Sequence, residues 1–385
     1  MKERKILLEA GPMVSKNKSG VGYYVEGLLR SLATENHGDL NLSAYYFDFL
    51  GLNKPKTPDI KGLYFHKIKI IPGKIISVCR KIGFQPFLEL FIFTKSDLVL
   101  FTNYVALPLL RRGTKTGLIV YDMSFFDTEE YVQEKNLYSL QRYAPKSILK
   151  ADIIITISEF TRSRILHHFP ELKAKIIVTP IPPIYSSRNK IPLPPNFKKL
   201  GIKKGKYILY IGTIEPRKNI ESLIRAYAQL SKQEIDEFSL VLAGGKGWKD
   251  DGILQEIEQQ QKNGLSIINT GYITDKYRDS LYQNACCVVL ASHYEGFGMP
   301  IVEAMQYKIP IVVSDIAVFR ETAGDAALYF NHNSIEDISE KISLILKDKG
   351  LRSTLVSNGI EQLKKYSWKS NADLVLSEIK NTLND

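Results

Sequence analysis

Residues 295–303 read Glu-Gly-Phe-Gly-Met-Pro-Ile-Val-Glu, and they follow an apolar run, residues 287–291, that is typical of a buried strand. The two glycines predict a tight turn with bare backbone N–H groups, and the proline suits the first position of a helix. A helix start attracts anions, because its first N–H groups lack partners within the helix. With a carboxylate at each end, the stretch favours a ligand that carries phosphate and many hydroxyl groups.

Short apolar strands alternate with amphipathic helices along the whole chain, which is typical of parallel α/β sheets. One predicted helix carries Ile220, Leu223, Ile224 and Tyr227 on a single face. The sequence therefore predicts an α/β protein with two Rossmann-like sheets. The predicted buried strands are residues 5–9, 98–101, 117–120 and 153–157 in the first half, and 207–211, 239–243, 266–268, 287–291 and 311–314 in the second.

A chain of 385 residues is long for one domain, so two domains are expected. Prolines cluster between residues 180 and 195, and such a stretch makes a stiff connector. We predict a first domain at residues 1–185, a linker at 186–205, a second domain at 206–365 and a final helical segment at 366–385. The spacing of apolar residues in that segment allows it to cover the second domain or to cross back to the first.

The charge of the chain is positive and uneven. Residues 1–199 hold 30 lysines and arginines against 17 acidic residues (net +13), whereas residues 200–385 hold 22 against 24 (net −2). An anionic partner for the first half is therefore expected, although a well-solvated lysine-rich surface is an alternative. Residues 61–95 mix lysines and arginines with isoleucines and phenylalanines, which predicts contact with an anionic membrane surface. The alternative for this segment is a loop followed by an ordinary packed helix.

Several classes of protein are disfavoured. No apolar run approaches the roughly 18 residues of a membrane-spanning helix, and the charged, strand-like start is unlike a signal peptide. We therefore expect a cytoplasmic protein, at most peripheral at the inner face of a membrane. Three cysteines form no plausible disulfide set or zinc site, and packing is expected for Cys286 and Cys287. No RNA-binding module pattern is present, so no nucleic-acid partner is expected.

A second candidate site, residues 212–219, reads Gly-Thr-Ile-Glu-Pro-Arg-Lys-Asn. It follows a predicted strand, and parallel sheets bind ligands at the carboxyl ends of their strands. Arg217 and Lys218, at the expected opening of a helix, can hold a diphosphate by charge-assisted hydrogen bonds beside Thr213. The alternative is a solvated basic helix start, with Asn219 or Glu221 assisting the cap.

The two glutamates of residues 295–303 suit different parts of such a ligand. Glu303 is expected in the first turn of its helix, where it can accept hydrogen bonds from ribose hydroxyls, although a carboxylate is favoured there in any case. Glu295 can meet sugar hydroxyls or the reacting carbon. The backbone N–H groups of Phe297, Gly298 and Met299 are expected to face the sugar or its phosphates.

Weaker candidates lie at other predicted strand ends. Gly20 and Gly22 permit close approach of a phosphate, although a plain turn explains them equally. Asp122 can orient an acceptor hydroxyl or cap a helix or turn. The glycine-rich turn at 244–248, which includes Gly245, can form one wall of a nucleoside pocket. Tyr272 and Ile273 can stack or pack on a base.

Metal chemistry is not expected. The chain has no Asp-x-Asp pair and no His/Cys cluster with metal spacing, so we predict no metal and no cofactor. Cations and helix amides would then neutralise a departing diphosphate.

These residues resemble the family-four retaining glycosyltransferases of GT-B fold. The resemblance rests on residues 207–346, which include 210–219, 244–248, 295–305, 314–315 and 320–327, and on the shorter segments 20–23, 121–122 and 157–161. It implies two Rossmann-like domains facing across a cleft: an acceptor-binding domain, a nucleotide-sugar-binding domain, and a final helix that returns to the first. It also implies retaining, metal-independent transfer of a sugar from a nucleotide diphosphate to a glycan or polyprenyl-diphosphate-linked acceptor.

By position, the resemblance implies that Arg217 and Lys218 hold the diphosphate, Glu303 the ribose and Glu295 the donor sugar, with Gly20 and Gly22 near the phosphates. The segments at 247–248 and 324–327 look most like bacterial mannosyltransferases of surface polysaccharide assembly, which favours GDP-mannose as the donor. A UDP- or dTDP-sugar donor and a nucleotide-sugar epimerase on the same frame stay open as alternatives.

Two departures from the family pattern matter. The family usually has histidine before the aspartate, and here that residue is Tyr121, whose hydroxyl titrates near 10. Tyr307 and Lys308 stand where many members have a small residue and a glycine. The tyrosine at 121 puts in question the contact that this position makes with the sugar or the acceptor. Tyr307 and Lys308 put in question how the helix that carries Glu303 ends.

Overall fold

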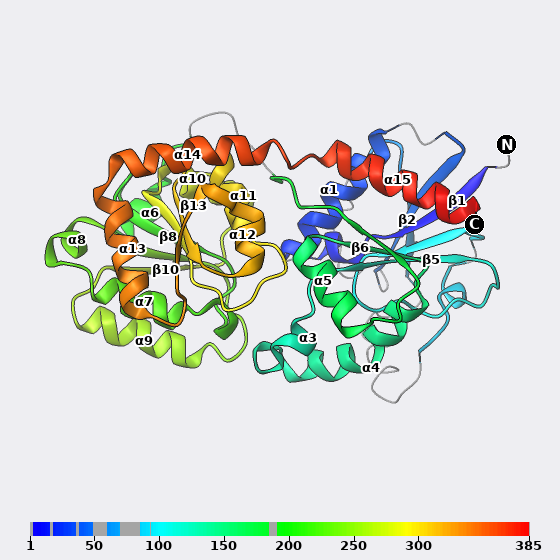
Figure 1. Cartoon of the computed structure of the whole chain (residues 1–385), viewed down its shortest axis with the longest axis horizontal. Helices are drawn as coiled ribbons and strands as arrows, with labels where there is room; N and C mark the ends of the chain where they lie inside the picture. Colours follow the sequence, from blue (N-terminus) through cyan, green and yellow to red (C-terminus); the bar gives the residue numbers. More distant parts are fainter. Residues whose placement is uncertain are drawn as a thin grey trace. The chain divides into compact units, whose positions relative to one another are not determined.

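The computed structural model describes residues 3–15, 18–35, 38–48, 60–69, 85–92, 94–184 and 191–384. The chain forms two compact units (Figure 1). Unit 1 comprises Met1–Ile181 and Ser367–Asp385, and unit 2 comprises Pro182–Tyr366. Each unit is described by itself.

Unit 1 is built on a parallel sheet of order β3-β2-β1-β4-β5-β6-β7. Its strands are β1 (Arg4–Glu9), β2 (Leu40–Phe47), β3 (Tyr64–Ile68), β4 (Leu98–Phe101), β5 (Lys115–Val120), β6 (Ile153–Thr156) and β7 (Lys175–Val178). The helices are α1 (Gly20–Thr34), α3 (Ser124–Asp127), α4 (Glu134–Lys150), α5 (Glu159–His168) and α15 (Trp368–Asn384), with short 3-10 turns η1 (Gly11–Val14), η3 (Leu88–Leu90) and η4 (Glu129–Tyr131).

Unit 2 is built on a parallel sheet of order β10-β9-β8-β11-β12-β13. Its strands are β8 (Tyr207–Ile211), β9 (Ser239–Ala243), β10 (Ile267–Gly271), β11 (Cys287–Leu290), β12 (Ile311–Ser314) and β13 (Ala327–Phe330). The helices are α6 (Pro195–Lys199), α7 (Ile220–Ala228), α8 (Lys232–Glu237), α9 (Asp251–Lys262), α10 (Asp275–Asn284), α11 (Met299–Gln306), α12 (Ala317–Ala323), α13 (Ile335–Lys347) and α14 (Lys349–Leu363), with 3-10 turns η5 (Pro216–Lys218) and η6 (Gly324–Ala326).

The two parallel sheets confirm the predicted α/β class. The central strands were readable because they are buried along their whole length, as in β4, β6, β8 and β11. The predicted face of α7 is also confirmed, since Ile220, Leu223, Ile224 and Tyr227 are fully buried. No helix within the described ranges is both long and apolar enough to cross a bilayer.

The sequence missed β2, β3, β7 and β13. Three of these are edge strands, and an edge strand buries only part of its surface, so no continuous apolar run marks it. The exposed or half-buried Tyr64, Phe65 and His66 of β3 illustrate this. The fourth, β2, carries Asn41 and Ser43 within its first half.

Helix α15 packs on α1 within unit 1. Trp368 lies over Gly27, where a Cβ atom would stand 2.3 Å from the indole ring. Ser31 Oγ donates to the Trp368 carbonyl at 2.8 Å, and Asn371 Nδ2 donates to the Pro180 carbonyl at 2.7 Å. Because Gly27 has no side chain, Trp368 packs directly against the backbone of α1, and this contact helps to hold α15 on α1.

Replacing Gly27 by alanine should loosen α15. The new methyl group must displace the indole of Trp368, so we expect a loss of about 1–3 kcal/mol in the free energy of unfolding, measured by denaturant titration. Gly350→Ala, at an exposed position of α14, is the control, and there we expect little change. Equal effects of both substitutions would contradict the packing role of Gly27.

Candidate functional site

The loops after β8, β9 and β11 meet at the carboxyl edge of the unit 2 sheet, because these three strands are neighbours in it. Ile214 pairs with Lys246 between the first two loops. A Cβ atom at Gly244 would stand 1.7 Å from the Gly212 carbonyl oxygen, and one at Gly247 would stand 2.4 Å from that of Ile214. The glycines of the 244–248 turn thus let two backbones touch.

A largely buried cluster of two acidic and two basic residues joins the first and third loops. Arg217 bridges two carboxylates, with Nη2 at 2.8 Å from Glu215 Oε1 and Nη1 at 2.8 Å from Glu295 Oε2. Lys218 Nζ pairs with the other oxygen of Glu295. Glu295 therefore forms ion pairs with both cations that the sequence predicted to bind a diphosphate. Together with Glu215 it balances their two positive charges.

Backbone and hydroxyl contacts fix this cluster further. Arg217 Nη1 donates to the Tyr294 carbonyl at 2.7 Å, and Ser292 Oγ donates to Glu295 Oε1 at 2.8 Å. The N–H of His293 donates to the Arg217 carbonyl at 2.9 Å. Hence the guanidinium is oriented from both loops before any ligand arrives.

The Glu295 carboxylate stays ionised at neutral pH. Burial acts to raise its pKa, but the adjacent Arg217 and Lys218 charges outweigh burial and lower the pKa to about 2. A group that is ionised in this way cannot serve as a general acid near neutrality. It can accept hydrogen bonds from hydroxyl groups and stabilise positive charge.

The cations do not open the next helix, as the sequence predicted, but lie one step before it. Arg217 and Lys218 belong to the 3-10 turn η5, and α7 begins at Ile220. Between them Asn219 adopts a left-handed conformation with φ of 53°, and its Nδ2 donates to the His332 carbonyl at 2.9 Å. Asn219 therefore separates η5 from α7, and Arg217 and Lys218 in η5 contact Glu295.

The turn at 296–298 opens α11. Gly298 has φ of 100°, and a Cβ atom there would stand 2.8 Å from the Phe319 ring, so only glycine fits. Phe297 is buried, its carbonyl accepts from Thr322 Oγ1 at 2.7 Å, and its ring lies against that of Tyr366. Met299 is the first residue of the helix, so Pro300 is the second and not the first as predicted.

Glu303 does not lie in the first turn of its helix, as the sequence predicted. Because α11 begins at Met299, Glu303 falls on the second turn and is buried. Its Oε2 accepts from the Tyr282 hydroxyl at 2.8 Å, and its Oε1 lies 3.5 Å from Arg278 Nη1. Burial raises the pKa of Glu303 despite the opposing effects of Arg278 and the Tyr282 hydrogen bond.

Sequence reasoning missed Arg278 and Tyr282. They are four residues apart in α10 and therefore share one face of that helix. An arginine and a tyrosine on the same face of a predicted helix are the signal that could have paired them with a buried carboxylate.

Other predicted residues of unit 2 lie close to these loops. Gly245 adjoins Tyr272, since its Cβ atom would stand 3.6 Å from the tyrosine Cβ. The Tyr272 ring is 50% exposed and available for stacking, and Ile273 is half-buried beside it. Thr213 accepts through its carbonyl from the buried Tyr210 hydroxyl at 2.8 Å. Lys308, with φ of 59°, is left-handed just after α11, where other family members have glycine according to the resemblance.

Asp122, in unit 1, has a local role in the structure. Its Oδ1 accepts from the N–H of Ser124 at 3.0 Å and from Ser124 Oγ at 2.7 Å, so it satisfies the first N–H group of the short helix α3. Tyr121 is buried, and its hydroxyl donates to the Thr102 carbonyl at 2.8 Å. Burial raises the pKa of Tyr121 well above 10, so this tyrosine is a neutral core residue.

Gly20 and Gly22 form the first turn of α1 and not a plain turn. A Cβ atom at Gly22 would stand 2.6 Å from the Pro12 carbonyl oxygen, so close packing of η1 explains this glycine. The start of α1 borders a cavity of about 380 Å³ at the carboxyl ends of β1 and β4, lined by Glu9, Gly11, Pro12, Ser15, Ser19, Val21 and Asn103. This cavity is the polar candidate site of unit 1.

Among the described residues, no group of three or more His, Cys, Asp and Glu side chains could hold a metal ion. Cys287 is buried in β11 and its neighbour Cys286 is partly buried, both as free thiols. Cys79 and residues 70–84 of the predicted membrane-contact segment lie outside the described residues. Leu88, in the described part of that segment, is buried in the unit 1 core.

The profile of the family described as glycosyl transferases group 1 matches residues 194–362. O-antigen chain mannosyltransferase B of Escherichia coli is 34% identical over 252 residues, which are 65% of this chain and 66% of that protein. O-antigen chain mannosyltransferase RfbU of Salmonella typhimurium is 29% identical over 232 residues, 60% of each chain. The chain belongs to the group 1 glycosyltransferases.

In structure, sucrose-phosphate synthase from Thermosynechococcus elongatus is similar over 99% of both chains, with a TM-score of 0.71 at 18% identity. At that identity the likeness shows the fold alone, and the predicted GT-B fold class is confirmed. The chain spans 66% of the length of O-antigen chain mannosyltransferase B and 20% of that of the mannosyltransferase WbdA.

Proposed function

We propose that this protein is a retaining, metal-independent glycosyltransferase. It moves a sugar, mannose from GDP-mannose, to a glycan or polyprenyl-diphosphate-linked acceptor in surface polysaccharide assembly, at the cytoplasmic face of a membrane. The observation that carries the proposal is the pairing of Arg217 and Lys218, just after β8, with Glu295. The names of the similar O-antigen mannosyltransferases support mannose as the sugar.

In the proposed reaction the two cations bind the diphosphate of the donor. Arg217 offers a planar pair of donors that suits phosphate oxygens, and Lys218 adds a compact charge. Both stabilise the charge that grows on the diphosphate as the bond to the sugar breaks. Tyr272 stacks on the base, Glu303 meets the ribose, and the N–H groups of residues 297–299 meet the sugar or its phosphates.

Glu295 has two successive partners in this scheme. Without donor it neutralises Arg217 and Lys218, and with donor the diphosphate takes over part of that role. The freed carboxylate oxygen then accepts from a hydroxyl of the donor sugar. The acceptor hydroxyl attacks from the side that the leaving group vacates, and its proton passes to a leaving-group oxygen.

A screen of melting temperature with GDP-, UDP-, dTDP- and ADP-sugars tests the proposal. Selective stabilisation by GDP-mannose is expected, because a ligand that binds only the folded state raises the melting temperature. A selective response to a UDP- or dTDP-sugar would retain the glycosyltransferase and change the donor. Conversion of the sugar in the absence of any acceptor would indicate an epimerase instead.

Lys218→Ala should lower transfer by roughly a hundredfold or more, since the variant loses one donor to the departing diphosphate. Lys218→Arg, which keeps the charge, should retain more of the rate. Initial rates with labelled GDP-mannose measure both, and circular dichroism checks that each variant is folded. Near-wild-type turnover of Lys218→Ala would remove the lysine from the mechanism.

Glu295→Gln should bind free GDP more tightly and transfer sugar more slowly. The substitution leaves the cluster with one uncompensated positive charge, which favours the diphosphate but removes the carboxylate for the sugar hydroxyl. Calorimetric titration with GDP measures the first effect, and initial rates measure the second. The exposed Glu221→Gln carries the same change of charge and serves as the control. Unchanged or weaker GDP binding by Glu295→Gln would refute the proposal that the diphosphate replaces Glu295 as the partner of Arg217 and Lys218.

Transfer should be unaffected by EDTA, because the cations of residues 217 and 218 do the work that magnesium does elsewhere. Rates measured before and after dialysis against EDTA check this. A loss of activity that magnesium restores would show that the diphosphate needs a metal after all.

A further inference from the structure

The strands of the unit 1 sheet are parallel, so their amino ends lie together along one edge, here called the amino edge. Lysines and arginines stand at or just before the start of nearly every strand. Those with largely exposed side chains are Lys5 in β1, Lys61 before β3, Lys95 before β4, Arg111 and Arg112 before β5, Lys150 before β6 and Lys175 in β7. Acidic residues also stand at these strand starts, namely Glu3, Asp39, Asp97 and Asp152, so the amino edge carries mixed charge with an excess of positive charge.

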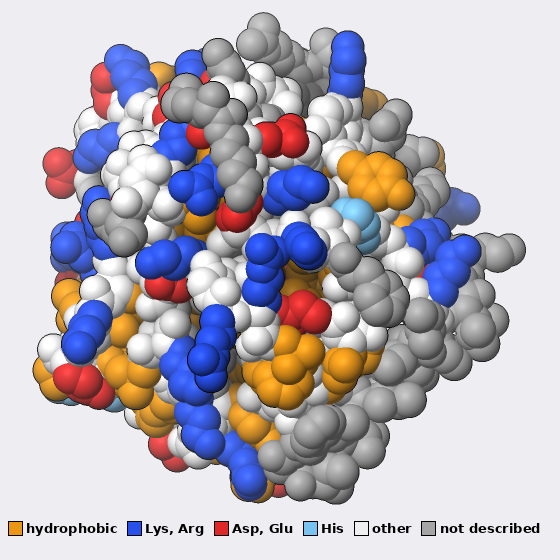
Figure 2. All heavy atoms as spheres, turned by 90° about the vertical axis from the view of Figure 1, so that its right-hand side faces the viewer, with side chains coloured by type: hydrophobic (Ala, Val, Ile, Leu, Met, Phe, Trp, Pro, Cys, Tyr) orange, Lys and Arg blue, Asp and Glu red, His pale blue; other side chains and the backbone are white. Residues whose placement is uncertain are grey.

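Figure 1 places the chain start, and with it the beginning of β1, at its right-hand side, and Figure 2 looks at that side. Blue basic side chains dominate over red acidic ones there, with orange apolar side chains between them. Lys115 pairs with Asp152 at 3.4 Å, and Lys175 pairs with Glu378. Among the described residues, no acidic side chain forms an ion pair with Lys95, Arg111 or Arg112.

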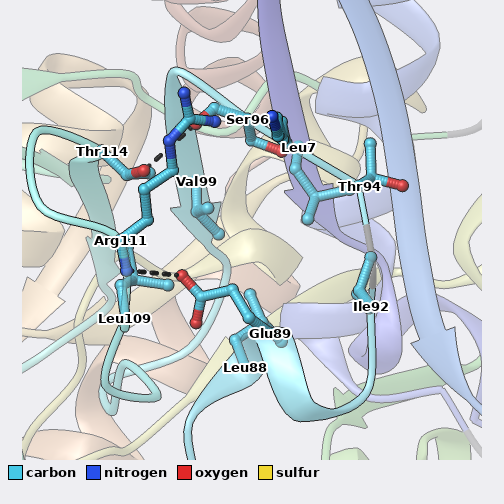
Figure 3. A pocket seen from close by; sticks show the side chains of 11 residues that line it. Leu7, Leu88, Glu89, Ile92, Thr94, Ser96, Val99, Leu109, Arg111 and Thr114 are labelled. Carbon is cyan, nitrogen blue, oxygen red and sulfur yellow. Dashed lines mark hydrogen bonds between the residues drawn. The ribbon is translucent and has the colours of Figure 1, made fainter.

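Behind the amino edge lies a cavity of about 220 Å³ (Figure 3). Leu7 of β1, Val99 of β4 and the side chains of Leu88, Ile92 and Leu109 make its walls. The cavity exceeds the roughly 150 Å³ that admits an apolar guest as large as benzene. An apolar space of this size suits a segment of hydrocarbon chain.

Polar groups are confined to the rim of the cavity. Glu89, Thr94, Lys95, Ser96, Arg111 and Thr114 line it there, the Glu89 carboxylate being engaged by the N–H groups of Leu110 and Arg111, and Figure 3 shows the Arg111 side chain reaching toward Ser96. Thr114 Oγ1 donates to the Ser96 carbonyl at 3.1 Å. An apolar interior with cations at its mouth is complementary to an amphiphile with an anionic head.

The loops beside the cavity are held firmly and yet expose leucines. The Glu89 carboxylate accepts from the N–H groups of Leu110 and Arg111 at 2.9 and 3.2 Å. These bonds tie the 109–111 loop to η3, where Leu90 and Leu110 are 55% and 53% exposed. Leucines that face water beside arginines are typical of surfaces that enter a membrane interface.

We propose that the amino edge docks on a bilayer containing anionic phospholipid, and that the cavity takes one acyl chain of such a lipid. The lipid phosphate then lies between Lys95 and Arg111, and Leu90 and Leu110 enter the interface. This docking goes beyond the proposed transfer reaction. The mouth of this cavity lies at the amino edge, whereas the Glu9 cavity lies at the opposite end of β1, although Leu7 in the cavity wall is only two residues from Glu9. We therefore assign the bound lipid as an anchor that enters from the amino edge.

Sedimentation with vesicles of phosphatidylglycerol and phosphatidylcholine, compared with phosphatidylcholine alone, tests the charge component. Wild-type protein should bind only the anionic vesicles, and less at high salt. The double variant Arg111→Glu/Arg112→Glu should bind roughly tenfold more weakly or worse. Lys135→Glu/Lys232→Glu, with the same change of charge away from the amino edge, is the matched control. Equal binding by the two double variants would overturn the docking surface.

Photolabelling with phosphatidylglycerol that carries a diazirine on its acyl chain tests the cavity. Labelled peptides should contain residues that line it, such as Ile92 or Val99. Thr94→Phe should fill the mouth and reduce the labelling severalfold, whereas Thr94→Val should keep it. Vesicle binding without labelling of these peptides would overturn the chain-binding cavity, and preference for a polyprenyl phosphate over phosphatidylglycerol would overturn the anchor. The donor screen uses no lipid, so failure of the transfer proposal is seen separately.

Discussion

The Glu295 carboxylate, set between Arg217 and Lys218, is the interaction that joins the first and third loops of unit 2. Two adjacent cations repel each other and lose hydration when buried, and a shared carboxylate offsets both costs. Glu215 completes the balance by engaging the far side of Arg217. The cluster can therefore stay largely buried and charged without a ligand, with its donors already oriented.

Strand order explains why residues 77 and 78 positions apart in the chain meet. The unit 2 sheet has β8 between β9 and β11, so the loops after these strands share one edge. In unit 1 the strand order likewise places β1 between β2 and β4, and the polar cavity with Glu9 and Asn103 lies at that point. Both units place polar groups where the strand order reverses, as open parallel sheets generally do.

The sequence predicted the features that follow from local composition and burial. It missed the features that depend on which strands and side chains are neighbours in the fold. Fully buried strands such as β8 and β11 were recognisable, whereas the edge strand β3 was not. The cations and Glu295 were recognisable as chemistry, but their mutual pairing was not, since it requires the crossover between β8 and β11. Glu303 was misplaced because Gly298, left-handed at the helix start, lets α11 begin one residue before the proline.

The same stretch of nine residues gives its two carboxylates opposite electrostatic environments. Glu295 faces two cations, which lower its pKa to about 2, while burial raises the pKa of Glu303. Environments that shift the pKa values of two carboxyl groups in opposite directions suit the two groups to different roles. A carboxylate that stays charged suits the region where positive charge develops, near the sugar. A carboxyl group whose pKa is raised by burial, with a tyrosine and an arginine beside it, suits hydrogen bonding with neutral hydroxyls. The glycine turn between them, with the left-handed Gly298 at the start of α11, separates the two environments.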